Sequence, residues 1–135
     1  MEARGPTRYL LGMYSIRIER SFHAAHAVTI QGVDEIPHPH DWRVRVTLEA
    51  SGLDEDGLLC DFHDLETRLA AIIDPFEGTD LNHQPPFDRV NPSAENIAGH
   101  IARKLEVDLP ATVSAILVAI TEAPGCEARC RIDRS

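Results

Sequence analysis

The sequence predicts an α+β fold in which a four-stranded antiparallel sheet carries two helices on one face. Apolar and polar residues alternate in two segments near the beginning of the chain and in one near its end. Two stripes with helical spacing lie between them, and segments rich in Gly, Pro, Asn and Asp separate these elements. The resulting order is strand, strand, helix, helix, strand, strand. Helices then cover one face of a single sheet.

The strands are predicted from alternation with a period of two residues, which is typical of a half-buried strand. The first apolar face is Tyr14, Ile16, Ile18 and Phe22, and the second is Trp42, Val44, Val46 and Leu48. A nearly continuous apolar run over 113–120 predicts a central strand, and alternation at Ala128, Cys130 and Ile132 predicts the last one. We also expect a short strand over 58–60.

The helices are predicted from apolar stripes with a spacing of three and four residues. The first stripe is Phe62, Leu65, Leu69, Ile72 and Ile73, and the second is Ala94, Ile97, Ala98, Ile101 and Leu105. Asp61 is the expected N-cap of the first helix, and Pro75 ends it. Asn91 and Pro92 are the expected cap and first residue of the second. Residues 75–90 form a long irregular segment, of a kind that is often functional.

Length and composition narrow the class of protein. The chain of 135 residues is expected to form one domain over 13–135, preceded by a flexible N-terminal extension over 1–12. Its 13 basic and 22 acidic residues give a net charge of −9, which disfavours binding to nucleic acid or to an anionic membrane. Three cysteines without C-x-x-C spacing, and no signal peptide or membrane-length apolar run, predict reduced thiols and a cytoplasmic location.

Three histidines around the first hairpin are the strongest sign of a functional site. Residues i and i+2 of a strand face the same side, roughly 6.6 Å apart. Parity therefore places His38 and His40 on the Trp42 face and His26 on the Phe22 face, beside a wide loop over 27–37. A three-histidine face that leaves one position open is typical of a catalytic metal site. Of the remaining histidines, His23 falls on the opposite face, and His63 and His100 are expected to be solvated or packed in helices.

At this point the chain resembles the family of 6-pyruvoyltetrahydropterin and 6-carboxytetrahydropterin synthases, which have the T-fold. The resemblance runs from about Met13 to Ile132. It is carried by Phe22-x-x-x-His26, His38-x-His40, Asp61-Phe62-x-x-Leu65, Leu81-Asn82, Asn91-Pro92-Ser93-Ala94-Glu95-Asn96 and Thr121-Glu122.

The resemblance implies one zinc ion bound by His26, His38 and His40, in trimers that stack into hexamers with active sites between subunits. The substrate it implies is 7,8-dihydroneopterin triphosphate. Glu122 would anchor the pterin ring, because two adjacent N–H donors suit the two oxygens of a carboxylate. Burying the Glu122 carboxylate without partners would cost free energy, which also favours a ligand-binding role. Groups around Ser93 and Glu95 would complete the pterin pocket.

The chain departs from this family in its acid/base residues. Members carry a catalytic cysteine four to six positions before His38, where this chain has Gly32, Val33 and Asp34. Members also carry Leu-Asp-His where this chain has Phe76, Glu77 and Gly78. The usual His-Gly-His is His-Pro-His here, which removes a backbone donor.

Three explanations remain open. Asp34 or Glu35 acts as the base, as in relatives that use a glutamate and cleave the side chain in an aldolase-like reaction. Glu77 keeps the role of the family aspartate while His83 supplies the imidazole. Alternatively, the protein binds zinc and pterin without turnover.

The sequence therefore predicts a zinc-dependent pterin lyase of the 6-carboxytetrahydropterin synthase type, in the synthesis of 7-deazaguanine and queuosine. One alternative is a dihydroneopterin side-chain aldolase that produces 6-hydroxymethyldihydropterin for folate. The other is a zinc- and pterin-binding protein with no turnover.

Overall fold

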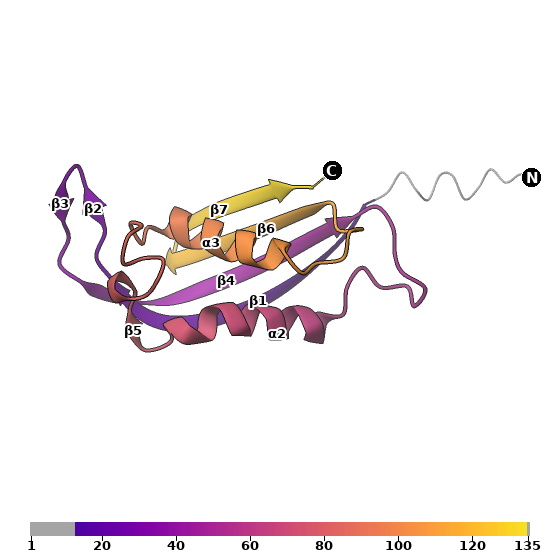
Figure 1. Cartoon of the computed structure of the whole chain (residues 1–135), viewed down its shortest axis with the longest axis horizontal. Coiled ribbons are helices and arrows are strands. Elements are labelled where there is room, and N and C mark those ends of the chain that lie inside the picture. The colour runs from indigo at the N-terminus through magenta and orange to yellow at the C-terminus, as the bar shows by residue number, and fades with distance from the viewer. Residues whose placement is uncertain (1–12, 135) are drawn as a thin grey trace, which may run out of the picture.

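The computed structural model describes residues 13–134. The elements, in chain order, are β1 (Tyr14–His26), β2 (Thr29–Ile30), β3 (Val33–Asp34), β4 (His38–Ala50), α2 (Phe62–Ile73), the 3₁₀ helix η1 (Asp74–Phe76), β5 (Thr79–Asp80), the 3₁₀ helix η2 (Leu81–His83), α3 (Ala94–Glu106), β6 (Ala115–Ala123) and β7 (Cys126–Asp133). They form a five-stranded sheet with the helices α2 and α3 beside it, and a separate two-stranded hairpin (Figure 1). The expected extension over 1–12 lies outside the described residues.

The main sheet has the strand order β5-β1-β4-β6-β7. The pairs β1–β4, β4–β6 and β6–β7 are antiparallel, as predicted. The prediction of four strands was wrong, because β5 adds a fifth that pairs in parallel with β1 at Ala24 and Ala25. The expected wide loop over 27–37 contains the separate β2–β3 hairpin, which projects from one end of the molecule (Figure 1). Each of these extra strands has two residues, too few for any periodicity in the sequence to mark it.

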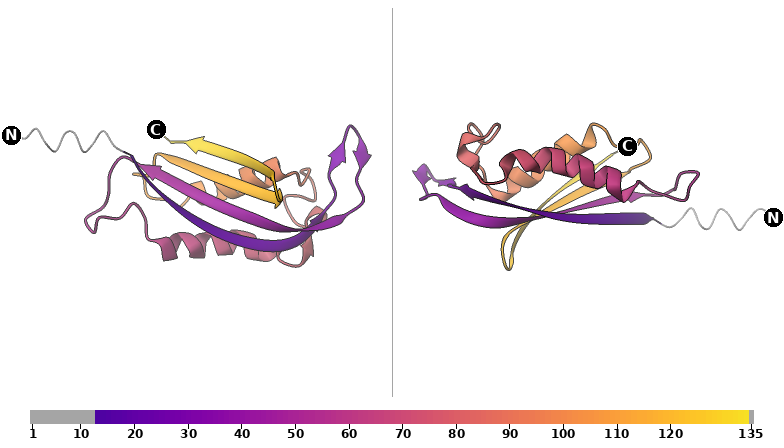
Figure 2. Two further views of the ribbon diagram at one scale, coloured as in Figure 1. Left: turned by 180° about the vertical axis from the view of Figure 1, so that it is seen from behind. Right: turned by 90° about the horizontal axis from the view of Figure 1, so that it is seen from below.

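Both helices cover the same face of the sheet, which leaves the other face open (Figure 2). Most residues of the predicted apolar faces point into the core between the helices and the sheet, but Phe62 and Tyr14 are 51% and 44% exposed. Buried members are Leu65, Leu69 and Ile73 of α2, Ile97, Ala98, Ile101 and Leu105 of α3, and Trp42, Val44, Val46 and Leu48 of β4. The predicted α+β architecture is therefore confirmed.

Each of the two long helices begins at a side-chain cap. Asp61 is the N-cap of α2, as predicted, and its carboxylate accepts a hydrogen bond from the His63 N–H at 2.9 Å. The predicted cap of α3 was wrong. Ser93 caps this helix, and its hydroxyl accepts a hydrogen bond from the Asn96 N–H at 3.1 Å. The side chain of Asn91 does not cap the helix and instead hydrogen-bonds to the backbone of Thr29 in the hairpin.

The predicted strand over 58–60 is absent from the described residues. The side chain of Asp54 accepts hydrogen bonds from the N–H groups of Asp56 and Leu58, both at 2.9 Å. This local side-chain pairing holds the segment in a turn and competes with a strand. No helix within residues 13–134 is both long and apolar enough to cross a membrane.

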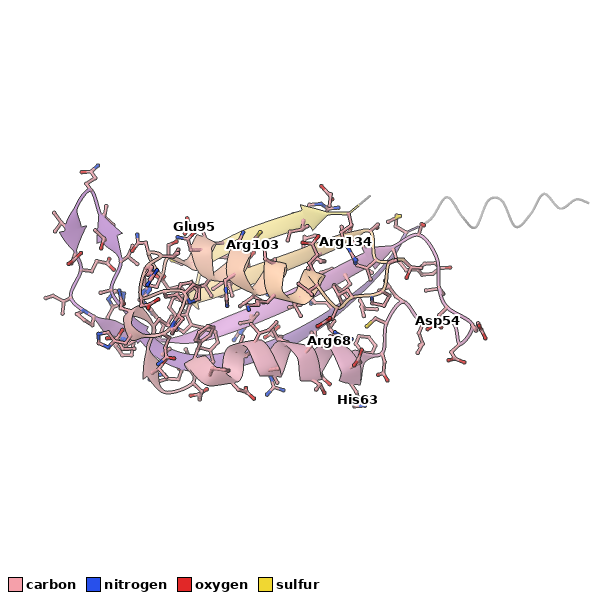
Figure 3. All side chains as sticks on the ribbon, in the orientation of Figure 1. Asp54, His63, Arg68, Glu95, Arg103 and Arg134 are labelled. Atoms are coloured by element: carbon pink, nitrogen blue, oxygen red, sulfur yellow. The ribbon has the colours of Figure 1, made fainter. Side chains whose placement is uncertain are left out.

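The end of β1, the beginning of β4 and the beginning of α3 meet at one end of the molecule (Figure 1). In Figure 3, Glu95 marks the beginning of α3 at this end, whereas His63 and Asp54 lie at the opposite end. The histidines at 26, 38 and 40 therefore lie far from His63.

His100 packs inside the helical layer, against the rings of Phe76 and Phe87 at centroid distances of 6.0 and 5.4 Å. Burial lowers the pKa of His100 below its ordinary value of 6.5, and the nearby charges of Lys104 and Arg103 lower it further. The folded state thus holds this ring in its neutral form.

We expect His100 to destabilise the fold in acid. Because its pKa is lower in the folded state, the unfolded chain binds more protons below about pH 6.5, and the free energy of unfolding falls as pH drops. His100→Gln should make this fall shallower in urea denaturation curves between about pH 7.5 and pH 5.5. His63→Gln is the control, since the His63 side chain is 93% exposed and should leave the slope unchanged. Parallel slopes for wild type and His100→Gln would contradict the assignment.

Candidate metal centre

The pairing of β1 with β4 brings the three histidines together. His26 lies directly opposite His38, and His40 lies opposite Ala24, on the neighbouring position of the same face. One ring nitrogen from each of the three histidines can be chosen so that all lie within 4.8 Å of one another. The parity argument from the sequence is therefore confirmed in its geometry.

The ring of Trp42 lies beneath this cluster. Its centroid is 4.8 Å from that of His26 and 5.2 Å from that of His40, with nearly perpendicular planes. Its Nε1–H donates to the Ala24 carbonyl at 3.1 Å, which fixes the indole. The histidines thus stand on a rigid, apolar base within the core.

Backbone carbonyls set the tautomers of two of the rings. His26 Nδ1 lies 2.8 Å from the Pro92 carbonyl, and His38 Nδ1 lies 2.9 Å from the Ile36 carbonyl. A carbonyl only accepts, so each Nδ1 carries the hydrogen and donates it. The Nε2 lone pairs of both rings are then available to a metal ion, as is usual for metal-ligating histidines.

These rings fit a zinc ion. His26 Nε2 and His38 Nε2 lie 3.1 Å apart, yet both are acceptors and so do not hydrogen-bond to each other. His40 Nε2 is buried and has no hydrogen-bond partner among residues 13–134. Two nitrogens bound at 2.0–2.1 Å to one tetrahedral zinc ion would lie roughly 3.3 Å apart. His26 Nε2 and His38 Nε2 thus have the spacing and the free lone pairs that zinc requires, and the His40 ring lies close enough to supply a third nitrogen.

The protonation state of His40 agrees with this fit. Burial lowers the pKa of His40 below its ordinary value, and the neighbouring His26 and His38 act in the same direction. Glu122 opposes these effects without reversing them. A metal ligand must be neutral imidazole, so a lowered pKa favours metal binding near neutral pH.

Glu122 extends from β6 to the histidines. Its two carboxylate oxygens lie 3.6 Å from His26 Nε2 and 3.7 Å from His40 Nε2. The β6–β7 register shifts between Thr121 and Ala123, and such bulges change the direction of side chains.

Glu122 also borders two hollows. One, of about 460 Å³, is lined also by His40, Asp41, Arg43 and Thr121; the other, of about 230 Å³, is lined also by Glu95 and Cys126.

Of the two acidic candidates in the hairpin, only Glu35 reaches the histidines. Glu35 Oε1 lies 4.0 Å from His38 Nε2 and accepts a hydrogen bond from the Val28 N–H at 3.0 Å. The Asp34 carboxylate instead accepts the Thr29 hydroxyl at 2.6 Å. The structure therefore distinguishes two residues that the sequence left equivalent.

Glu77 and His83 are not brought together. Glu77 accepts a hydrogen bond from the backbone N–H of His23 at 3.2 Å, whereas His83 is exposed at the end of η2. The His23 ring bonds Asp41 at 2.8 Å, away from the three-histidine face, as parity predicted. The predicted Glu77–His83 pair therefore has no contact that supports it.

The two candidates at the beginning of α3 differ in position. Ser93 uses its hydroxyl to cap the helix, which is a structural role. Glu95 lines the smaller hollow together with Glu122, so two carboxylates border one space. Glu95 is the better placed of the two to contact a ligand that is rich in N–H donors.

Sequence reasoning missed three contributions to this site. The Pro92 carbonyl orients His26, and the side chains of Asn82 and Asn91 hold the segment that follows His26. The available signals were the Leu81-Asn82 and Asn91-Pro92 motifs. These motifs did not indicate which residues they contact, because the contacting residues lie 55 to 66 positions apart in the sequence.

The fold is the T-fold, and its three histidines form a candidate zinc centre. Comparisons with known proteins support the fold and show the family. A family model described as 6-pyruvoyl tetrahydropterin synthase matches residues 15–133. The chain belongs to this family.

Known relatives include pterin enzymes of more than one activity. The dihydroneopterin monophosphate aldolase of Pyrococcus furiosus is 30% identical over 102 residues, which cover 76% of this chain and 83% of that protein. Among solved structures, the 6-pyruvoyl tetrahydropterin synthase of Plasmodium falciparum superposes with a TM-score of 0.78 at 16% identity, covering 90% of this chain and 98% of that one. A catalytic-residue mutant of the Plasmodium vivax enzyme, with alanine in place of a glutamate, has a TM-score of 0.74 at 21% identity, covering 90% and 99%. The chain is therefore a relative of pterin-processing lyases.

Removal of one ligand should abolish tight zinc binding. We expect His38→Ala to weaken zinc affinity by more than about 100-fold, beyond the loss usual for an outer-shell partner. The His38 side chain is 37% exposed, so the fold should tolerate the change. Competition with a chromophoric chelator, together with metal analysis, measures the affinity. His63→Ala is the control, and equal zinc affinity in the two variants would remove His38 from the site.

Proposed function

We propose that this protein is a zinc-dependent lyase that cleaves the side chain of 7,8-dihydroneopterin, or of its phosphate ester, to give 6-hydroxymethyl-7,8-dihydropterin. The observation that carries this proposal is Glu35, a carboxylate 4.0 Å from His38 Nε2 that directly follows positions 32–34, where the sequence lacks the family cysteine. An aldolase relative at 30% identity and a relative whose catalytic residue is a glutamate support it.

His26, His38 and His40 would hold the zinc ion, which, when bound, lowers the pKa of a hydroxyl group and stabilises developing negative charge. Glu122 and Glu95 would accept hydrogen bonds from the amide and amino groups of the pterin ring. Charge-assisted bonds of this kind contribute roughly 1.5–3 kcal/mol each. These contacts would place the side chain of the substrate beside Glu35.

Glu35 would act as the general base of a retro-aldol cleavage. It takes the proton from the hydroxyl on the second side-chain carbon, and the O–H electron pair becomes a carbonyl bond. The bond between the first and second carbons breaks, and its electron pair passes to the first carbon and into the pterin ring. The same proton can then return to the first carbon. The products are the 6-hydroxymethyl pterin and glycolaldehyde, or glycolaldehyde phosphate from the ester.

The 6-carboxytetrahydropterin synthase activity expected from the sequence is the second candidate. The match to 6-pyruvoyl tetrahydropterin synthase over residues 15–133 favours this candidate. Its substrate would be 7,8-dihydroneopterin triphosphate and its product would feed 7-deazaguanine and queuosine synthesis. Both reactions need zinc, a pterin anchor and a base near the side chain, so the same residues would serve either.

We further propose that the protein works as a homo-oligomer, a trimer or a dimer of trimers. Within the described residues β7 is an edge strand, and β1 has an outer partner only at Ala24 and Ala25. Unpaired edges favour pairing with another chain. The hairpin next to Glu35 also exposes Ile30, Val33 and Ile36, which are 57%, 69% and 85% accessible. A neighbouring subunit would bury these side chains and enclose the site.

Product analysis tests the activity. Zinc-loaded protein is incubated separately with 7,8-dihydroneopterin, its monophosphate and its triphosphate, and products are identified by mass spectrometry. A 6-hydroxymethyl product supports the aldolase reaction and a 6-carboxy product supports the second candidate. Tight pterin binding with unchanged substrate would instead indicate a binding protein.

The choice of base gives a sharper prediction. Glu35→Gln should lower kcat by about 10²–10⁴, the usual contribution of a general base, and should leave zinc content unchanged. Glutamine keeps the oxygen that accepts the Val28 N–H, so the loop should hold its position. Asp34→Asn, in the adjacent residue, should keep kcat within about threefold, because that carboxylate is turned to Thr29. The reverse pattern would assign the base to Asp34.

A further inference from the structure

Two of the three residues that follow His26 are held by side chains from distant parts of the chain. Ala27 N–H donates to Asn82 Oδ1 at 2.8 Å, and Asn82 Nδ2 donates to the Ala27 carbonyl at 2.9 Å. Thr29 N–H donates to Asn91 Oδ1 at 2.9 Å, and Asn91 Nδ2 donates to the Thr29 carbonyl at 2.9 Å. A carboxamide has both an acceptor and donors, so each asparagine pairs with one residue as a neighbouring strand would.

Val28 lies between these two clamped residues and holds Glu35. Its N–H donates to Glu35 Oε1 at 3.0 Å, and its carbonyl accepts the Glu35 N–H at 3.0 Å. The position of the Glu35 carboxylate therefore depends on the position of Val28, which depends on Ala27 and Thr29.

The two asparagines belong to well-anchored parts of the structure. Asn82 lies in η2, where Asp80 accepts the Asn82 N–H at 3.0 Å and Leu81 is fully buried. Asn91 precedes Pro92, whose carbonyl accepts His26 Nδ1–H at 2.8 Å. One corner of the chain thus orients a histidine through a carbonyl and the hairpin through a side chain.

The hairpin lacks the packing that would otherwise fix it. Its apolar side chains Ile30, Val33 and Ile36 are largely exposed, and none belongs to the hydrophobic core. Segments with few buried apolar contacts open at low free energy. Hydrogen bonds from the asparagines therefore decide where this part of the hairpin lies.

We propose that Asn82 and Asn91 are positioning residues for Glu35, holding Val28 from both sides so that the carboxylate stays beside the histidine cluster. The inference rests on the proposed role of Glu35 as the base, but its geometric part does not depend on turnover. Neither asparagine touches the histidine rings in this arrangement. The metal ligands should therefore remain in place when the clamps are removed.

The experiment uses Asn82→Ala, Asn91→Ala and Asn91→Asp in the full-length, zinc-loaded protein. Ser114→Ala is the matched control, because its hydroxyl donates to the Glu49 carbonyl at the far end of the sheet. Hydrogen exchange at the Val28 and Glu35 amides should speed up about tenfold or more in both alanine variants, the effect of losing roughly 1.4 kcal/mol of local protection. Zinc content should stay at the wild-type level.

Turnover should respond in kcat more than in KM. Misplacement of a catalytic group by about 1 Å can lower the rate by up to 10²-fold, so we expect kcat to fall by about 10- to 100-fold in the alanine variants. KM should change little, because Glu122 lies on β6. Asn91→Asp keeps the acceptor for the Thr29 N–H and loses the donor, so it should fall between wild type and Asn91→Ala.

Unchanged exchange at Val28 and Glu35, with stability lowered only as in Ser114→Ala, would overturn the inference. So would a loss that appears in KM alone. If the wild type shows no turnover of any neopterin, the proposed function fails. The exchange measurement then still decides whether the asparagines hold the Glu35 segment.

Discussion

The site depends on the register of β1 against β4. His26 faces His38 across the two strands, and His40 comes two residues further along β4 on the same face. A slip of one residue would turn one strand's histidines to the open face of the sheet. The stacked pair of Phe22 and Trp42, with ring centroids 6.0 Å apart, fixes the register four residues from His26. The same apolar face that builds the core thus also builds the candidate metal centre.

Burial is strongest at His26 and leaves His40 Nε2 without a hydrogen-bond partner among residues 13–134. His26 is 1% exposed, and one nitrogen from each of the three rings lies within 4.8 Å of the others. Carbonyls of Pro92 and Ile36 hold the hydrogens of two rings away from it. Unpartnered polar atoms in a low-dielectric interior are unfavourable, so a cation at this point removes a penalty as well as gaining ligands. Glu122 adds a carboxylate that would balance the charge of a bound cation and that borders the adjoining hollows.

The sequence predicted those parts of the fold that repeat over many residues. Alternation in β1 and β4 gave the face of each histidine, and the helical stripes gave α2 and α3. The two-residue strands escaped prediction because no period can appear in so short a segment. Asn91 was assigned to a helix cap on local chemistry, but its side chain pairs with Thr29, and the neighbouring Ser93 caps the helix instead. The choice between Asp34 and Glu35 likewise needed the fold, since it depends on which carboxylate reaches Val28 and His38.

The central claim is that backbone carbonyls fix the tautomers of His26 and His38 so that their Nε2 lone pairs, together with a nitrogen of His40, face one metal position. Long-range ¹H–¹⁵N NMR correlation of the histidine rings tests this directly in the metal-free protein. The account predicts that His26 and His38 carry their hydrogen on Nδ1 before metal is added, and that zinc then shifts the Nε2 resonances of His26, His38 and His40 together. Hydrogen on Nε2 of His26 or His38, or a zinc-induced shift confined to other histidines, would contradict it.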